Sequence, residues 1–377
     1  MKFAITRALF CASMTGLFTL TASAAEVTVK IGHSGPLTGA QSVSGKDNER
    51  GVRLAIEELN ASKFRIGPDI VKFELLSEDD QGDPKQGVSA AQKLIDAGVK
   101  AVIGHYNSGV SIPASKLYND AQVPMITGAS SNPKLTQQGF PYVFRLAASD
   151  NTMGSMMARF GAGFLKAKKV AVIDDRTSYG TGVADVFISR ANELKMQVVG
   201  REFTTDKSTD FMSILTKVKA LKPEVIFFGG YYPQGGLMAR QMKQLEMNIP
   251  LLGGDGLCAK DIITLSGGAV EGKLFCAQGG TSLDMLPNGT AFRERFKKAF
   301  GTDIDVYAPA FYVATLTVAE AMKQAESTDP KKFVPVLAKS KFTSLLGDVK
   351  FDSTGDWEGA PVTVYEVVGG KLEPIRR

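Results

Sequence analysis

Short apolar runs alternate with longer amphipathic stretches along this chain, and this alternation limits the folds it can adopt. The run VTVKIGH (27–33) precedes a stretch at 49–61 whose apolar residues fall on one helical face. The run VKFELLSED (71–79) precedes a second helical stretch at 83–98, with Asp-Pro at its start and Gly at its end. Strands that alternate with helices of this length indicate an α/β fold with a mostly parallel sheet.

The same pattern occurs twice. The strand-like runs AVIGHY (101–106) and VPMITG (123–128) have counterparts in IFFGGY (226–231) and IPLLGG (249–254). A chain of 377 residues also exceeds what one hydrophobic core usually serves. We therefore expect one α/β architecture used in two lobes. Ligands of open α/β sheets bind beyond the carboxyl ends of the strands, so two facing lobes would surround one cleft.

The N-terminal residues have the features of a secretory signal peptide. The basic residues Lys2 and Arg7 precede an apolar run at 8–20, and the small residues Ala-Ser-Ala follow at 22–24. The apolar run is shorter than the ~20 residues that a membrane span needs, which argues against a retained anchor. We expect residues 1–25 to be removed and the remaining chain to be exported as a soluble protein.

Charge and cysteine content restrict the partners and the compartment. The formal net charge is +5 without any block of like charges, so the sequence does not indicate a nucleic-acid partner. Two cysteines, Cys258 and Cys276, lie beyond the predicted signal peptide. In an oxidising compartment their separation favours a disulfide, and two buried thiols are the alternative.

An enzyme is the first function to test, because His105 and Ser108 lie close together in GHYNSG. A serine hydrolase needs a base within reach of its serine, a carboxylate that orients the base, and often a G-x-S-x-G turn, which is missing here. The histidines and cysteines lack the spacing of metal ligands. We expect no enzymatic activity, no metal and no cofactor. A secreted serine hydrolase that uses Ser108 and His105 stays a distant alternative.

A binding site explains the same serine better. Ser108 follows a strand at the expected start of a helix, where free backbone N–H groups and a hydroxyl favour an anion. The loop GASSNP (128–133) follows the next strand and offers the Ala129 carbonyl and the Ser131 hydroxyl. In the second repeat, GGDG places Asp255 at the corresponding strand end. These groups suit a carboxylate and an ammonium group on one carbon atom, as in an α-amino acid; each could also be an ordinary turn or cap residue.

Four tyrosines fall in loops or at the ends of expected elements, where a core residue would be unusual: Tyr106, Tyr179, Tyr231 and Tyr307. Aromatic side chains that line a cleft can hold an apolar ligand side chain while their hydroxyls find polar partners. Ordinary packing is the alternative for each of them.

The chain resembles the type I periplasmic solute-binding proteins of ABC transporters, in the leucine/isoleucine/valine-binding branch. The motifs that carry the resemblance span nearly the whole chain after residue 25: SGPLTG (34–39), EDDQGDPKQGV (78–88), VIGHYNSGVSIPAS (102–115), MITGASSNP (125–133), DDRTSYGTGVA (174–184), FFGGYYPQGG (227–236) and GGDG (253–256). The resemblance implies two Rossmann-like lobes joined by three crossovers around a ligand cleft. It also implies a periplasmic protein, expected to be a monomer, that delivers an amino acid to an inner-membrane ABC permease.

The family's boundaries and binding positions carry over to this sequence as expectations. We expect lobe 1 to comprise residues 26–149 and 279–358, and lobe 2 residues 150–278 and 359–377. The carboxylate ligands correspond to Ser108 and Ser131, and the ammonium ligands to Ala129, Ser131 and Asp255. The residues expected to line the pocket for the ligand's side chain are Ser44, Tyr106, Tyr179, Tyr231 and Tyr307.

Three departures from the family concern the ligand. An aromatic residue that branched-chain binders carry after SGP is replaced by a longer loop with Ser44 near that place, Asp255 replaces a glutamate, and Ser131 replaces a threonine. A disulfide that some relatives have in the first lobe is also missing, with Gly82 and Asn107 at its positions. The main hypothesis is a branched-chain or other apolar amino acid. A non-amino ligand such as an aromatic acid or an amide is the alternative.

Overall fold

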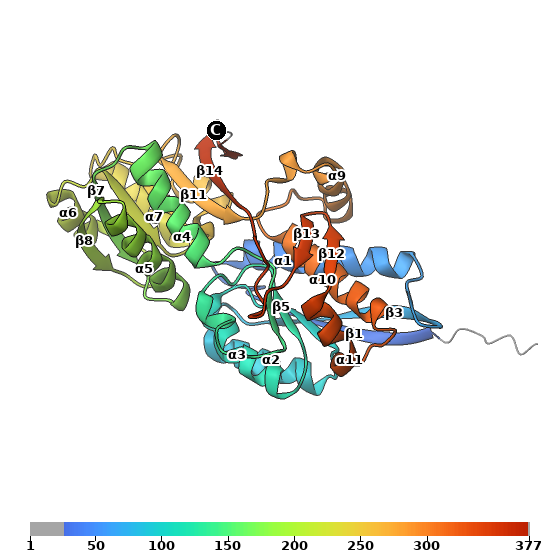
Figure 1. Ribbon diagram of the computed structural model, residues 1–377. Helices are drawn as coiled ribbons and strands as arrows, with labels where there is room; N and C mark the ends of the chain where they lie inside the picture. Colours follow the sequence, from blue (N-terminus) through green and yellow to red (C-terminus); the bar gives the residue numbers. More distant parts are fainter. Residues whose placement is uncertain (1–25, 376–377) are drawn as a thin grey trace, which may run out of the picture.

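The computed structural model describes residues 26–375. The chain forms two α/β lobes that lie side by side (Figure 1). The first lobe contains a six-stranded sheet in the order β2-β3-β1-β4-β5-β6. Its strands are β1 (Glu26–Gly35), β2 (Arg65–Ile66), β3 (Asp69–Asp79), β4 (Ala101–Gly104), β5 (Met125–Thr127) and β6 (Val143–Arg145). All neighbours in this sheet pair in parallel except β2 and β3.

The second lobe contains a seven-stranded sheet in the order β15-β14-β11-β10-β9-β7-β8. Its strands are β7 (Lys169–Asp174), β8 (Gln197–Phe203), β9 (Val225–Gly229), β10 (Leu251–Gly253), β11 (Leu274–Gly279), β14 (Val362–Val368) and β15 (Lys371–Pro374). The five strands from β8 to β11 are parallel and follow the same order as β3 to β6, so the predicted duplication is confirmed. A separate hairpin consists of β12 (Lys341–Ser344) and β13 (Gly347–Lys350).

Helices cover both sheets. Around the first sheet lie α1 (Ser42–Ala61), α2 (Pro84–Asp96), α3 (Ser108–Asp120), α9 (Gly289–Phe300), α10 (Ala308–Gln324) and α11 (Pro330–Lys339). Around the second lie α4 (Asp150–Arg159), α5 (Ser178–Glu193), α6 (Met212–Ala220), α7 (Tyr232–Gln244) and α8 (Asp261–Leu265). Short turns of other helix types complete the fold: η1 (Pro133–Leu135), η2 (Phe160–Phe164), η3 (Asp255–Leu257) and η4 (Leu283–Met285).

The chain passes between the lobes three times, after β6, after β11 and before β14. The last passage is the red segment that crosses between the lobes in Figure 1. Three connections of this kind make the fold a type I periplasmic binding protein architecture, as predicted. The lobe boundaries that we placed after residues 149, 278 and 358 stay a prediction. The predicted signal peptide, residues 1–25, lies outside the described residues.

Apolar burial holds each lobe together. All five residues of β9 are buried, and the ring of Phe227 stacks on Phe187 of α5 with a centroid distance of 4.0 Å. Burial of an aromatic side chain of this size contributes about 1.5–3 kcal/mol.

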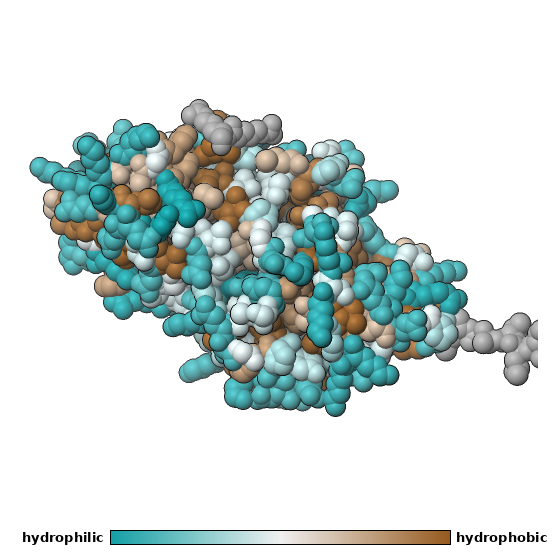
Figure 2. Space-filling model, in the orientation of Figure 1, coloured by the Kyte–Doolittle hydropathy of each residue, from teal (hydrophilic) through white to brown (hydrophobic). Residues whose placement is uncertain are grey.

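Figure 2 shows polar side chains over much of one face of the molecule, with apolar residues at the surface in separate patches.

The sequence pattern predicted one helix too short. The amphipathic stretch began at residue 49, but α1 begins at Ser42. Its first two turns contain the buried polar residues Ser44, Asp47 and Asn48. Hydrophobic periodicity cannot detect such a segment, because its partners are polar groups from the other end of the chain.

Candidate functional site

The ends of four parallel strands bring the predicted site residues together. Tyr106 and Ser108 follow β4, and Ala129 and Ser131 follow β5. From the second lobe, Tyr231 follows β9 and Asp255 follows β10. All six are at most 5% exposed, so they lie in a buried region where the two lobes meet.

Ser108 begins α3, as the sequence predicted, and its hydroxyl accepts a 3.2 Å hydrogen bond from the backbone N–H of Asn132. This bond joins the loop after β4 to the loop after β5 and places Ser108 close to Ser131. The first N–H groups of a helix have no acceptor within the helix, so the start of α3 favours an anion.

Thr127, at the end of β5, fixes the loop that contains Ala129 and Ser131. Its hydroxyl donates to the carbonyl of His105 at 2.7 Å and accepts from the N–H groups of Ala129 and Ser130 at 3.1 and 2.9 Å. Ser130 turns its own hydroxyl toward the carbonyl of Tyr106, at 2.9 Å. The sequence analysis did not single out Thr127, although a threonine directly before a Gly-Ala-Ser turn is a recognisable signal.

The four predicted tyrosines form one cluster. The ring of Tyr106 lies 5.9 Å from that of Tyr231 and 5.4 Å from that of Tyr307, and the rings of Tyr179 and Tyr231 are 5.0 Å apart. Burial raises the pKa of all four phenols, so they stay neutral at physiological pH. Tyr106 and Tyr307 come from the first lobe and the other two from the second, so the cluster joins the lobes.

Asp255 begins the short helix η3 next to this cluster and is 4% exposed. Burial raises its pKa to about 6, while hydrogen bonds from the hydroxyls of Tyr179 and Tyr307 partly offset that effect. The Tyr179 hydroxyl in turn accepts from the backbone N–H of Gly256 at 2.9 Å. Asp255 is therefore a buried carboxylate in an aromatic environment, opposite the two serine loops.

Asp150, in the first turn of α4, is a further buried acid at this place. It is fully buried, and its backbone N–H donates to the carbonyl of Ser131 at 2.9 Å. Burial raises its pKa to about 8, and the charge of Asp255 raises it further. Sequence analysis missed Asp150, because an aspartate in SDN at a helix start looks like an ordinary helix-initiating residue.

Ser44 is buried, but its hydroxyl donates to the Asp305 carboxylate at 2.9 Å rather than toward the tyrosine cluster. Asp47, one turn further along α1, accepts from the backbone N–H groups of residues 305–308 at 2.9–3.1 Å. This carboxylate fixes the segment that carries Tyr307. The role of Ser44 in a ligand pocket stays a prediction.

The geometry does not form a serine hydrolase site. The two ring nitrogens of His105 lie 2.7 Å from an Asp80 carboxylate oxygen and 3.1 Å from the Tyr118 hydroxyl. Both nitrogens therefore have partners other than Ser108, and the ring is fully buried. Among residues 26–375 there is also no group of three acidic, histidine or cysteine side chains that could hold a metal ion.

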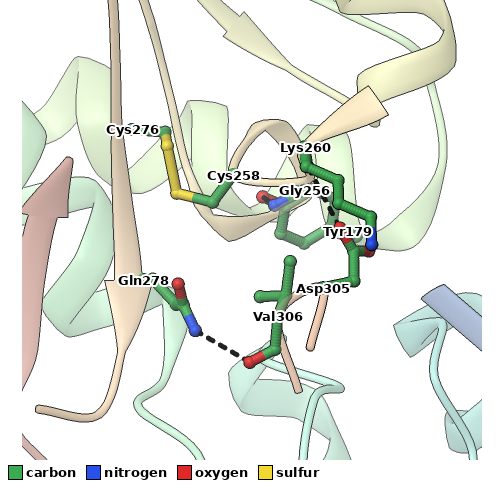
Figure 3. The surroundings of a disulfide bond; sticks show 8 residues. All are labelled: Tyr179, Gly256, Cys258, Lys260, Cys276, Gln278, Asp305 and Val306. Carbon is green, nitrogen blue, oxygen red and sulfur yellow. Dashed lines mark hydrogen bonds between the residues drawn. A yellow bond between two sulfur atoms is a disulfide. The ribbon is translucent and has the colours of Figure 1, made fainter. Parts of the chain in front are cut away.

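Cys258 and Cys276 form a disulfide beside the site, with Cα atoms 5.7 Å apart (Figure 3). Cys258 also lines a cavity of about 610 Å³ between the lobes, together with Gln278 and Tyr307. In the wall of this cavity, the Gln278 amide donates a 3.1 Å hydrogen bond to the carbonyl of Val306 (Figure 3). Since Tyr307 belongs to both, the cavity adjoins the tyrosine cluster.

Comparisons with known proteins agree with the two-lobed fold. Residues 28–371 match the model of a periplasmic binding protein family. The Leu/Ile/Val-binding protein homolog 2 of Brucella abortus (strain 2308) is 32% identical over 361 residues, 96% of each chain. The leucine-, isoleucine-, valine-, threonine- and alanine-binding protein of Pseudomonas aeruginosa is 31% identical over 344 residues, 91% of each chain.

A solved structure shows the same fold. The leucine binding protein LivK of Thermotoga maritima superposes with a TM-score of 0.86 at 30% identity, over 92% of this chain and 98% of that one. Two α/β lobes with paired polar loops at facing strand ends define the class of solute-binding proteins. The chain belongs to the periplasmic binding protein family, with Leu/Ile/Val-binding proteins among its relatives. None of the helices in residues 26–375 is long and apolar enough to cross a membrane.

Proposed function

We propose that this protein captures a free amino acid with an apolar side chain, in the first place a branched-chain one, and delivers it to the permease of an ABC transporter. The observation that carries the proposal is the buried carboxylate of Asp255 among tyrosines, opposite the loops of Ser108 and Ser131. The names of the relatives from Brucella and Pseudomonas support the same ligand class.

Each group of the ligand has a partner in this site. The hydroxyls of Ser108 and Ser131 and the start of α3 bind the carboxylate. The Ala129 carbonyl, the Ser131 hydroxyl and the Asp255 carboxylate accept from the ammonium group, and the charge of Asp255 offsets the loss of its hydration. The apolar side chain packs on the rings of the tyrosine cluster, with Ser44 at the margin of the pocket.

Binding requires no covalent step, and we assign no enzymatic activity to the protein. The lobes close around the ligand by rotation about the three connecting segments and open again at the permease. This role places the protein in the periplasm as a monomer, after removal of residues 1–25. The disulfide between Cys258 and Cys276 suits that oxidising compartment.

An aromatic acid fits the site less well than an amino acid. Its carboxylate would be the only charge it brings into a region that already contains the buried, charged carboxylate of Asp255. Like charges buried close together are unfavourable. An amide would bring no cation to pair with Asp255 either.

Isothermal titration calorimetry with the purified protein tests the proposal. We expect leucine, isoleucine and valine to bind with micromolar or tighter affinity, and to raise the melting temperature by mass action. Benzoate and acetamide serve as the non-amino ligands of the same panel. Binding of benzoate or acetamide without any binding of an amino acid would refute the proposed ligand class.

A further inference from the structure

The side chain of Asp150 has no partner that explains its burial. It is fully buried, and among residues 26–375 neither carboxylate oxygen has a well-formed hydrogen bond; the Ser131 hydroxyl lies close enough to lower the pKa but only partly offsets the burial. A buried carboxylate without a partner costs several kcal/mol, so such groups are rare unless a ligand or a function requires them.

Two ordinary explanations for Asp150 do not hold. A carboxylate in the first turn of a helix commonly caps it, but the N–H groups of Thr152 and Met153 donate to the Ser149 carbonyl instead, at 2.9 and 3.0 Å. An ion pair with Arg145 is also excluded. The guanidinium of Arg145 binds both carboxylate oxygens of Asp356, at 2.6 and 2.7 Å.

Asp150 lies where the two lobes meet and faces the candidate site. A Cβ atom added to Gly182, in α5 of the second lobe, would lie 3.3 Å from a carboxylate oxygen of Asp150. The hydroxyl of Ser131 lies beside the carboxylate and, by hydrogen bonding to it, lowers its pKa in part. The charge of Asp150 in turn raises the pKa of Tyr179 and Tyr231.

We propose that Asp150 is a second acidic residue of the ligand site and faces the same ammonium group as Asp255. This inference rests on the proposed function, because it takes an amino acid as the ligand. The three N–H donors of the ammonium group have acceptors in Ala129, Ser131 and Asp255, so Asp150 would act mainly through its negative charge, which adds to that of Asp255 in compensating the buried cation.

If both carboxylates face the ligand's ammonium group, the affinity for the ligand depends on pH. Burial and the charge of Asp255 hold the pKa of Asp150 near 8 without ligand, whereas Arg145 lowers it only in part. At neutral pH Asp255 is therefore charged and Asp150 carries a proton. A bound ammonium stabilises the charged form of Asp150, so the pKa falls and the proton leaves. Binding then strengthens as the pH rises.

Calorimetry of leucine binding at pH 7.5, in buffers with different ionisation enthalpies, counts the released protons. With a pKa of about 8 for Asp150 in the free protein, we expect about three quarters of a proton per leucine. The leucine affinity should rise about 25-fold between pH 6.5 and 8.5. In Asp150→Asn both effects should disappear, while Asp185→Asn, an exposed change on α5, should keep them.

The outcomes separate this inference from the proposed function. If leucine does not bind the wild-type protein, the proposed function fails. If leucine binds and Asp150→Asn releases as many protons as the wild type, Asp150 does not face the ammonium group. Should Asp150→Asn not fold, the absence of proton release from the wild-type protein at pH 7.5 would overturn the inference by itself.

Discussion

The side-chain amide of Asn132 donates a 2.6 Å hydrogen bond to the carbonyl of Ser178 and so joins the loop after β5 to the start of α5. The two residues belong to different lobes. A second bond across the cleft runs from the Tyr232 hydroxyl to the carbonyl of Ala40, at 3.0 Å. The structure therefore shows the lobes in a closed arrangement, held by direct contacts as well as by the connecting segments.

The substitution Asn132→Asp tests whether the bond to Ser178 favours closure. It replaces the donor by an oxygen that faces a carbonyl, yet keeps the oxygen that caps η1 by accepting from the Lys134 N–H. Loss of one such hydrogen bond costs about 1–1.5 kcal/mol, so we expect about tenfold weaker leucine binding. Small-angle scattering of the free protein should show a larger radius of gyration. The matched change Asn192→Asp, on the exposed end of α5, should alter neither value.

Asp255→Asn removes the proposed charge partner of the ligand ammonium. A buried cation without its partner costs about 3–5 kcal/mol, so leucine affinity should fall by two to three orders of magnitude. Asp210→Asn, an exposed change in the second lobe, serves as the control and should bind leucine like the wild type. Calorimetry with both variants measures the effect. Undiminished affinity of Asp255→Asn for every amino acid would remove Asp255 from the ammonium site.

The stability of the ligand-free protein should fall as the pH rises from 6.5 to 8.5. Burial raises the pKa of Asp150 to about 8 and that of Asp175 and Asp305 to about 7. The folded protein therefore holds protons that the unfolded chain, with pKa values near 4, has already released, and deprotonation of the folded state costs stability. Each such group changes the free energy of unfolding by up to about 1.4 kcal/mol per pH unit.

Urea unfolding at several pH values measures this slope. In Asp150→Asn we expect a shallower profile above pH 7.5 than in the wild type, because the buried acid with a pKa of about 8 has been removed. A profile of Asp150→Asn that is parallel to that of the wild type would contradict the raised pKa of Asp150. Buried His33, whose pKa burial lowers to about 4, changes stability mainly below pH 7.5 and does not affect the profile above that pH.

Local sequence signals predicted most of the fold. The stretch at 83–98 forms α2, with Pro84 in its first turn and a left-handed Gly98 after its end. The Asp83 carboxylate caps the helix, with bonds of 2.8 and 3.1 Å from the N–H groups of Lys85 and Gln86. Such signals depend only on neighbouring residues, so they can be recognised without the structure.

Contacts between distant segments could not be predicted in this way. The first turns of α1 are helical next to residues 305–308, which follow some 260 positions later in the chain. Likewise, nothing local distinguishes Asp150 from a helix cap, since its lack of a partner emerges only when both lobes are in place. The duplicated strand ends predicted where the site lies, but not which polar groups near it would be left unpaired.

Removal of the disulfide should destabilise the second lobe without preventing binding. Cys258 and Cys276 are separated by 18 residues, and closing a loop of this size stabilises a protein by about 3 kcal/mol. We expect the double variant Cys258→Ser/Cys276→Ser to lose about this amount in urea unfolding. The wild-type protein treated with a reductant should behave like the double variant, and the reductant should not change the double variant itself. Unchanged stability after reduction would show that the bond contributes nothing.

Asp47 connects the fold to the site, because its carboxylate fixes the backbone that carries Tyr307. Asp47→Asn offers one oxygen and an NH₂ group to the same N–H donors at 305–308, so part of these bonds must be lost. We expect a loss of about 2–3 kcal/mol in stability and on the order of fivefold to tenfold weaker leucine binding, as Tyr307 loses its fixed position. Asp303→Asn, an exposed change in the same segment, should affect neither measurement. If Asp47→Asn lost stability but bound leucine normally, Tyr307 would not contribute to the pocket.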